Sequence, residues 1–287
     1  MNPSESARNF DAYYYAHGCA APYERSEALL AFFEGIAKRI RSDIQPGTVL
    51  DAGCALGFLV EALRKLDVQA FGVDVSEYAI QNVHPTIRPY CWTGSIADPL
   101  PQRYDLIISI EVLEHMPKPD AERAIANLCA YSDDIVFSSS PFDYKEVTHF
   151  NVQPPEYWAE QFARQGFVRD VDFDGSFITP WAARFRRSHE PLPSVVRAYE
   201  RRFWLLWKEN VDLRSQALEM RDQLSARERT LQGPSNGGGR ENVELQQVLN
   251  SRTWRLAQKL QRVRLALAPH GSRREAWLRA LGIFSKE

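Results

Sequence analysis

Two glutamates and two histidines are the residues whose types and spacing most directly suggest chemistry. Glu111, Glu114 and His115 stand at positions i, i+3 and i+4, so they share one face if a helical turn begins there. His149 follows much later, just past a further expected strand. Carboxylates this close repel one another unless a proton or a cation lies between them. The group predicts either proton transfer, with Glu111 and a histidine base, or a metal site formed by all four residues.

Carboxylates and imidazoles together suit Mg²⁺ or Mn²⁺, and less well Zn²⁺. A cation lowers the pKa of an oxygen bound to it, which turns a weak hydroxyl nucleophile into a stronger one. Without a metal, His115 or His149 is the candidate general base. The plainer alternative makes the two glutamates a solvated helix face and His115 a helix cap.

A glycine turn further upstream predicts a small-molecule site. Buried residues lead into Asp51-x-Gly53-x-x-x-Gly57, and a second apolar run ends at Asp74. Glycines in such a strand–turn–helix let the backbone approach a ligand closely. The spacing departs from the G-x-G-x-x-G dinucleotide fingerprint, which places a pyrophosphate at the helix N-terminus. A ribose at Asp74 fits, because a carboxylate can accept hydrogen bonds from both ribose hydroxyls.

The elements that must position these residues alternate along the chain. Such alternation predicts a doubly wound, seven-stranded Rossmann-like α/β sheet with helices on both faces and ligands beyond the carboxyl ends of the strands. The expected strands are near 48–52, 68–73, 88–91, 104–109, 134–139, 168–173 and 180–186. The expected helices are near 26–42, 57–66, 77–83, 119–130 and 154–165.

Beyond residue 190 the pattern changes to heptads. With Phe203 at position a, apolar residues recur at a and d through about four heptads, and Asn210 occupies one a position. This predicts a C-terminal coiled-coil extension at 191–232 that forms a homo-oligomer through residues 193–231. One long helix packed on the domain is the alternative. We divide the chain into a domain at 1–190 with an N-terminal helical lid, this helix, a flexible linker at 233–240 and a basic helical tail at 241–287.

Composition limits the classes of protein. The chain has 287 residues with ordinary apolar and charged content, and its four cysteines show no metal or disulfide spacing. No apolar run approaches the roughly 20 residues of a membrane span, and no signal peptide is recognisable. We therefore expect a cytoplasmic protein. Residues 251–287 carry nine basic and two acidic residues, so an anionic partner is expected for the tail.

The turn and acid together resemble motif I of the class I S-adenosylmethionine (SAM) methyltransferases. The resemblance implies that the glycine turn lines the methionine end of SAM and that Asp74 binds its ribose. Gly94-Ser95-Ile96-Ala97-Asp98 lies where the family carries its adenine-flanking residues. The SAM-binding set implied is Asp51, Gly53, Cys54, Gly57, Asp74, Val75, Ser95, Ile96 and Ile110.

The E-x-x-E-H pattern followed by a distant histidine resembles two metal-assisted groups, the small-RNA 2′-O-methyltransferases and the ubiquinone-biosynthesis O-methyltransferases. Segments such as Ser138-Ser139-Ser140-Pro141 and His149-Phe150-Asn151 also resemble methyltransferases of bacterial surface-polysaccharide assembly. This second resemblance implies a SAM-dependent O-methyltransferase that acts on a sugar hydroxyl and could terminate a glycan chain. The metal would chelate the substrate's vicinal hydroxyls.

Three alternatives stay open beside the sugar substrate. RNA 2′-O-methylation is disfavoured because the catalytic segment is acidic and lacks a basic, aromatic-interleaved surface, so no nucleic acid partner is expected. Methylation of a quinone or natural product predicts a chain that stops near residue 190. A non-enzymatic coiled-coil scaffold is the third. The tail could meet a glycosyltransferase or an anionic membrane surface, which would place the protein on the inner face of the plasma membrane.

Overall fold

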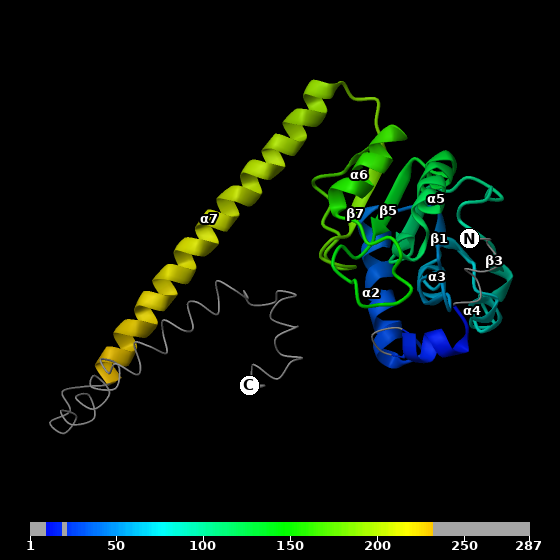
Figure 1. The fold of residues 1–287 in the computed structure, drawn as a ribbon, viewed down its shortest axis with the longest axis horizontal. Coiled ribbons are helices and arrows are strands. Elements are labelled where there is room, and N and C mark those ends of the chain that lie inside the picture. Colours follow the sequence, from blue (N-terminus) through cyan, green and yellow to red (C-terminus); the bar gives the residue numbers. More distant parts are fainter. Residues whose placement is uncertain (1–9, 19–21, 232–287) are drawn as a thin grey trace, which may run out of the picture. The chain divides into compact units, whose positions relative to one another are not determined.

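The computed structural model describes residues 10–18 and 22–231, which form alternating strands and helices (Figure 1). The strands are β1 (Thr48–Ala52), β2 (Gln69–Asp74), β3 (Cys91–Thr93), β4 (Leu106–Ile110), β5 (Asp134–Ser138), β6 (Phe167–Arg169) and β7 (Ala183–Arg187). The α-helices are α2 (Glu27–Asp43), α3 (Phe58–Arg64), α4 (Glu77–Gln81), α5 (Lys118–Tyr131), α6 (Pro155–Arg164) and α7 (Leu192–Leu231). Single turns occur at η2 (Tyr14–Gly18), η3 (Arg88–Tyr90) and η4 (Leu113–His115).

All seven strands belong to one sheet with the order β3-β2-β1-β4-β5-β7-β6. The pairs from β3 to β5 are parallel, and β7 runs antiparallel to both β5 and β6. The order reverses between β1 and β4, so the loops after these strands diverge and leave a crevice at their carboxyl ends. The predicted doubly wound, seven-stranded sheet is confirmed.

Helices cover both faces of this sheet because successive strand residues point to opposite sides. Val49 of β1 belongs to the apolar cluster formed with α2 and α3. Its neighbour Leu50 belongs to the cluster formed with α5 and α6. Both residues are fully buried. An apolar core therefore packs on each face of the central strands. The carboxyl ends of these strands border the cavity described below.

Local hydrogen bonds determine where two helices begin. The Ser26 hydroxyl accepts a hydrogen bond from the Leu29 amide at the start of α2. The Ser76 hydroxyl does the same for the Ala79 amide at the start of α4. Each cap satisfies one of the amides that a first helical turn leaves without a partner. Ser76 lies two residues after Asp74, so this cap also fixes the backbone beside that carboxylate.

Two predicted strands differ most clearly in their bounds. Residues 88–90 form η3, which contains Pro89 and precedes a strand that begins only at Cys91. Pro89 has no amide hydrogen, so it cannot donate to a ladder with β2, the strand that β3 pairs with. The segment predicted as a strand at 168–173 is extended only to Arg169. Asp170 then accepts from the amide of Asp172 in a turn, which ends the pairing.

The C-terminal heptads lie on α7, a helix of 40 residues. The chain divides into two compact units, 1–208 and 209–287, and the sheet lies in the first. One helix cannot test a coiled coil, so the predicted oligomer stays a prediction. The linker at 233–240 and the basic tail at 241–287 lie outside the described residues. Over the part that is described, no helix combines the length and apolar character needed to cross a membrane.

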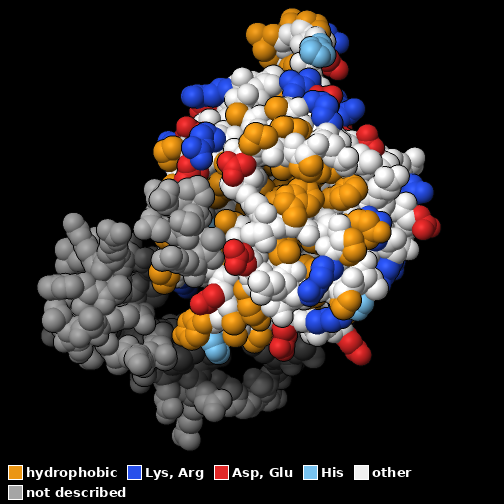
Figure 2. Space-filling view, turned by 90° about the vertical axis from the view of Figure 1, so that its right-hand side faces the viewer, with side chains coloured by type: hydrophobic (Ala, Val, Ile, Leu, Met, Phe, Trp, Pro, Cys, Tyr) orange, Lys and Arg blue, Asp and Glu red, His pale blue; other side chains and the backbone are white. Residues whose placement is uncertain are grey.

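Figure 2 shows one face of the molecule, on which hydrophobic side chains gather centrally and charged side chains of both signs lie mainly around them. A nucleic acid partner favours a continuous basic surface. Among the described residues visible on this face, basic and acidic side chains are interspersed. The expectation that nucleic acid is not the partner stays a prediction.

Candidate active site

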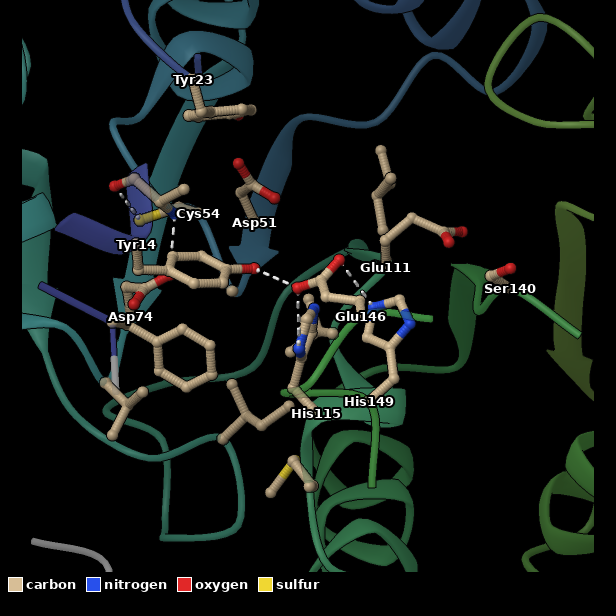
Figure 3. Close-up of a pocket in the computed structure, with 18 of the residues that line it drawn as sticks. Tyr14, Tyr23, Asp51, Cys54, Asp74, Glu111, His115, Ser140, Glu146 and His149 are labelled. Carbon is tan, nitrogen blue, oxygen red and sulfur yellow. Dashed lines mark hydrogen bonds and ion pairs between the residues drawn. The ribbon is translucent and has the colours of Figure 1, made fainter. Parts of the chain in front are cut away.

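A cavity of about 780 Å³ lies at the carboxyl ends of β1, β2 and β4. Figure 3 shows side chains from both halves of the chain that line it. Its wall is mainly apolar and includes eight aromatic residues, Phe10, Tyr14, Tyr15, Tyr23, Phe32, Phe33, Phe142 and Trp181. Its polar groups include a carboxylate pair and a histidine cluster, and the other charged residues of the lining are Glu111, Asp120, Arg123, Asp143 and Lys145. A mostly apolar cavity with a few convergent polar groups is typical of a small-molecule site.

The carboxylate pair is Asp51, near the end of β1, and Asp74, at the end of β2 (Figure 3). Asp74 accepts hydrogen bonds from the amides of Ala55 and Ser76, each at 2.8 Å. Burial raises the pKa of Asp74, although these amides act in the opposite direction. Burial, and then the charge of Asp74, raise the pKa of Asp51 to about 8. This half of the cavity therefore favours a cationic ligand, whose charge would offset that of the two carboxylates.

The glycine turn between these carboxylates requires glycine at two positions. Gly53 has φ of 94°, and a Cβ atom there would lie 2.3 Å from Cγ2 of Val112. Gly57 has φ of 73° and precedes α3 as its N-cap residue. Gly53 lines the cavity and Gly57 does not. The left-handed conformation of Gly57 instead directs the backbone from the turn into α3. Cys54 lines the cavity as a buried thiol whose pKa is raised, first by its hydrogen bond with Cys91 and then by burial.

The remaining residues predicted to bind the cofactor also reach this cavity. Val75 follows Asp74, Ser95 and Ile96 follow β3, and Ile110 ends β4, and all four line the wall. Ile96 is buried, and the Ser95 hydroxyl accepts a hydrogen bond from the Ala97 amide. The geometry thus gathers every predicted residue of this set except Gly57 around one space. Whether each contacts a ligand stays a prediction.

The predicted face of Glu111, Glu114 and His115 does not form, because the helical turn begins after Glu111. The turn η4 spans only Leu113–His115, and Glu111 has φ of 53°. Oε1 of Glu111 accepts from Ser138 at 2.7 Å and from the Trp181 indole at 2.9 Å. The three side chains therefore do not share one helix face, and the argument from i, i+3 and i+4 spacing was wrong.

Glu114 is fully buried and does not line the cavity. Its Oε1 accepts from the Ser140 amide at 3.3 Å, while Oε2 has no hydrogen-bond partner among the described residues. Burial, and then the charge of Glu111, raise the pKa of Glu114. Within the described ranges, the group able to hold a metal consists of His115, His149 and Glu146, so neither predicted glutamate belongs to it.

The two predicted histidines do meet (Figure 3), because the loop that carries His149 returns to η4. The backbone amide of the buried Asn151 donates to the carbonyl oxygen of Glu114 at 2.9 Å. This hydrogen bond holds the end of the loop beside η4. The rings of His115 and His149 lie 4.5 Å apart. Glu146 lies between them, 3.9 Å from Nδ1 of His115 and 3.3 Å from Nε2 of His149. His115, Glu146 and His149 are called the His–Glu–His cluster below.

The hydrogen bonds of this cluster assign its protons. The Thr148 hydroxyl donates its one hydrogen to Glu146 at 2.6 Å, so at His115, 3.0 Å away, it accepts from Nδ1. Nε2 of His115 then keeps its lone pair. Burial, and then His149, lower the pKa of His115 to about 4, which makes this ring neutral near pH 7. Nδ1 of His149 faces the Asp143 carbonyl oxygen at 2.8 Å, so it donates there.

Comparison with known proteins identifies the class. A family model described as "Methyltransferase domain" matches residues 23–170, slightly more than half of the chain. The chain belongs to this methyltransferase family. It is a SAM-dependent methyltransferase, as the glycine turn and Asp74 predicted.

Curated relatives of this methyltransferase are ubiquinone biosynthesis O-methyltransferases. That of Coxiella burnetii is 38% identical over 170 residues, which cover 50% of this chain and 72% of the relative. That of Methylococcus capsulatus is 31% identical over 99 residues, which cover 32% of this chain and 42% of the relative. The match thus spans less than half of one relative and almost three quarters of the other.

Solved structures support the fold of this methyltransferase. The magnesium protoporphyrin IX methyltransferase of Synechocystis, with bound S-adenosylhomocysteine (SAH), has a TM-score of 0.51 and 17% sequence identity. The match covers 65% of this chain and all of that chain. The same protein with bound SAM gives a TM-score of 0.50 with 19% identity, covering 66% of this chain and 98% of that chain. These identities are low, so they bear on architecture alone.

Several polar residues of the methyltransferase cavity were not predicted, and two of them, Glu146 and Trp181, contact predicted residues. Glu146 precedes His149 by three residues, and an acid so close to a candidate ligand is the signal that could have found it. Trp181 donates to Glu111 from the segment before β7, and nothing in its sequence neighbourhood indicated that contact. Both lie in or near irregular loops, where the hydrophobic periodicity of the sequence does not predict where a side chain lies in space.

The donor atoms of the cluster fit a divalent metal. Each of its three residues offers one ligand atom within 4.8 Å of those of the other two. Coordination by His115 would need the lone pair that the Thr148 hydrogen bond leaves on Nε2. Nε2 of His149 faces the Glu146 carboxylate, an arrangement that needs a proton or a cation between them. Two imidazoles and one carboxylate are compatible with Mn²⁺ or Zn²⁺ and less so with Mg²⁺.

Proposed function

We propose that this methyltransferase transfers the methyl group of SAM to a hydroxyl oxygen of a small aromatic acceptor. One observation carries the proposal: a single aromatic-walled cavity holds the carboxylate pair at one side and a neutral histidine with a free lone pair at the other. The curated relatives, which are O-methyltransferases of ubiquinone biosynthesis, support the choice of oxygen and of a small molecule.

The carboxylate pair would hold the cofactor. Asp74 would accept hydrogen bonds from the ribose, and Asp51 would lie beside the cationic methionine end. Gly53 would admit the ligand close to the backbone, because any side chain there would strike Val112. Bound SAM supplies an electrophilic methyl group on a sulfonium.

The His–Glu–His cluster would prepare the acceptor. Nε2 of His115 is the candidate acceptor of the hydroxyl proton, since its ring is neutral and its Nδ1 is already used as a donor to Thr148. Glu146 would stabilise the positive charge that the imidazole gains. The aromatic wall would orient a planar acceptor by stacking and would exclude water. If a divalent cation is held by the three residues instead, Nε2 of His115 would be one of its ligands rather than the base, and the cation would lower the pKa of the acceptor hydroxyl.

A sugar hydroxyl remains the second candidate. It is favoured by α7, which continues the chain to Leu231, whereas a small-molecule enzyme was expected to stop near residue 190. The curated relatives favour the small molecule over the sugar. The proposed glycosyltransferase partner and anionic membrane surface belong to this second candidate.

One experiment separates these candidates. Methyl transfer from labelled SAM is measured with catechol-type phenols, nucleotide sugars and glycans, each with and without a chelator. We expect transfer to the phenols, and loss of that transfer on chelation if the metal takes part. Transfer confined to sugars would replace the proposal with the second candidate. SAH binding without turnover on any acceptor would favour the inert scaffold.

A further inference from the structure

Three consecutive tyrosines near the N-terminus have different surroundings. Tyr13 is 73% exposed and does not line the cavity. Tyr14 and Tyr15 both line it, and their rings meet edge-on with centroids 5.4 Å apart, but their other contacts differ. The segment Phe10–Gly18 that carries them is tied to the rest of the domain, since the Tyr23 amide donates to the Tyr15 carbonyl oxygen at 2.8 Å.

Tyr15 belongs to the side of the carboxylate pair. It is 7% exposed and stacks on Tyr78 of α4, with ring centroids 5.7 Å apart. Burial, and then the charge of Asp74, raise the pKa of Tyr15, while a hydrogen bond with the Ser76 side chain acts in the opposite direction. The Ser76 hydroxyl in turn donates to the Phe10 carbonyl oxygen at 2.5 Å. The segment is therefore fastened directly beside the residue expected to bind ribose.

Tyr14 belongs to the side of the His–Glu–His cluster (Figure 3). Its hydroxyl donates to Oε1 of Glu146 at 3.0 Å, across 132 positions in the sequence. The rings of Phe10 and Tyr14 meet the His115 ring edge-on, at 5.5 and 6.2 Å. Glu146 also accepts from Thr148, so its orientation depends on two hydroxyl donors.

We infer that Phe10–Gly18 is a wall shared by both half-sites, in which Tyr15 supports the cofactor and Tyr14 positions the acceptor through Glu146. The inference rests on the proposed function for the acceptor half only. Tyr14 is a positioning residue here, because its contact is with Glu146. Adjacent residues of one segment contact the two half-sites, so a displacement of the segment would affect both.

The test uses three matched variants of the full chain, Tyr13→Phe, Tyr14→Phe and Tyr15→Phe, each of which removes one hydroxyl. We expect Tyr15→Phe to weaken SAH binding about five- to tenfold by calorimetry, because Tyr15 lines the cavity and its hydroxyl is the one polar group that the substitution removes. Tyr14→Phe should leave SAH affinity unchanged and raise the KM for the acceptor, or lower kcat, by a similar factor. Tyr13→Phe is the control and should match the wild type.

Amide hydrogen exchange gives a measurement that does not need an acceptor. Tyr14→Phe should speed exchange in residues 143–149, because Glu146 loses one of its two hydroxyl donors, and Tyr13→Phe should not. Equal exchange in these two variants, or unchanged SAH affinity in Tyr15→Phe, would overturn the inference. If no phenol is methylated by the wild type, the proposed function fails, while these two measurements still test the shared wall.

Discussion

Asp51 makes cofactor affinity depend on pH. It lies near the end of β1, 5% exposed, and burial together with the charge of Asp74 raises its pKa to about 8. The unliganded protein therefore holds this carboxyl protonated at neutral pH. In the proposed arrangement the α-ammonium of the methionine end, which SAH shares with SAM, would lie beside Asp51 and favour its ionised form, so binding should release a proton.

The size of this effect follows from linkage. Below a pKa of about 8, the release of one proton makes the association constant rise about tenfold per pH unit. Between about pH 6 and pH 8 this amounts to roughly 100-fold, or about 2.7 kcal/mol. In Asp51→Asn the amide cannot ionise, so the variant should bind SAH with an affinity that is nearly independent of pH.

Titration calorimetry with SAH, in buffers of different ionisation heat, measures both the affinity and the number of protons released. A wild-type affinity that stays constant across this range, with no proton released, would refute the reasoning. The unliganded protein offers a second measurement. The unfolded carboxyl ionises near pH 4 and the folded one only near pH 8, so stability should fall across that window. In Asp51→Asn the side chain cannot ionise, so the stability of the variant should fall less than that of the wild type across the same pH range.

Three further predictions concern other parts of the chain. His149→Ala should abolish methyl transfer yet keep SAH affinity within about twofold, and equal loss of both would contradict its place in the acceptor half. Glu61 has its pKa lowered to about 2, chiefly by the hydrogen bond from Arg25. Glu61→Gln should lower the unfolding free energy by about 2 kcal/mol at neutral pH, measured by urea titration. The difference between wild type and variant should disappear as pH falls from about 4.5 through about 2, because Glu61 of the wild type becomes protonated. On α7, Phe203→Asp with Leu206→Asp should convert an oligomer to a monomer in light scattering, and a monomeric wild type would refute the coiled coil.

The sheet and the cofactor half could be predicted because both follow from local patterns. Apolar runs fix where β1 and β2 lie, and parallel strands place the residues at their carboxyl ends on one edge. Asp51 and Asp74 therefore had to be neighbours once the alternation was recognised. The short spacing from Gly53 to Gly57 likewise determined a turn before α3.

The acceptor half could be predicted only in part. The sequence indicated that His115 and His149 would meet, since both follow strands that end at the same edge. It did not indicate that Glu111 takes φ of 53°, a conformation uncommon for residues other than glycine. That backbone angle moves Glu111 out of the helical turn. Glu146 takes its place beside the histidines through a loop whose path depends on tertiary hydrogen bonds, which periodicity does not report.

The loop from Ser140 to Asn151 is anchored at both ends on the same short turn. At one end the Ser140 amide contacts the Glu114 side chain, and at the other Asn151 contacts the backbone of Leu113 and Glu114. Apart from Glu146, Thr148 and His149, which make the contacts of the His–Glu–His cluster, residues between these anchors can be substituted without transmitting a displacement to β4. A change of acceptor preference could therefore arise, by evolution or by engineering, from substitutions in this loop alone. The residues proposed to bind the methyl donor would stay the same.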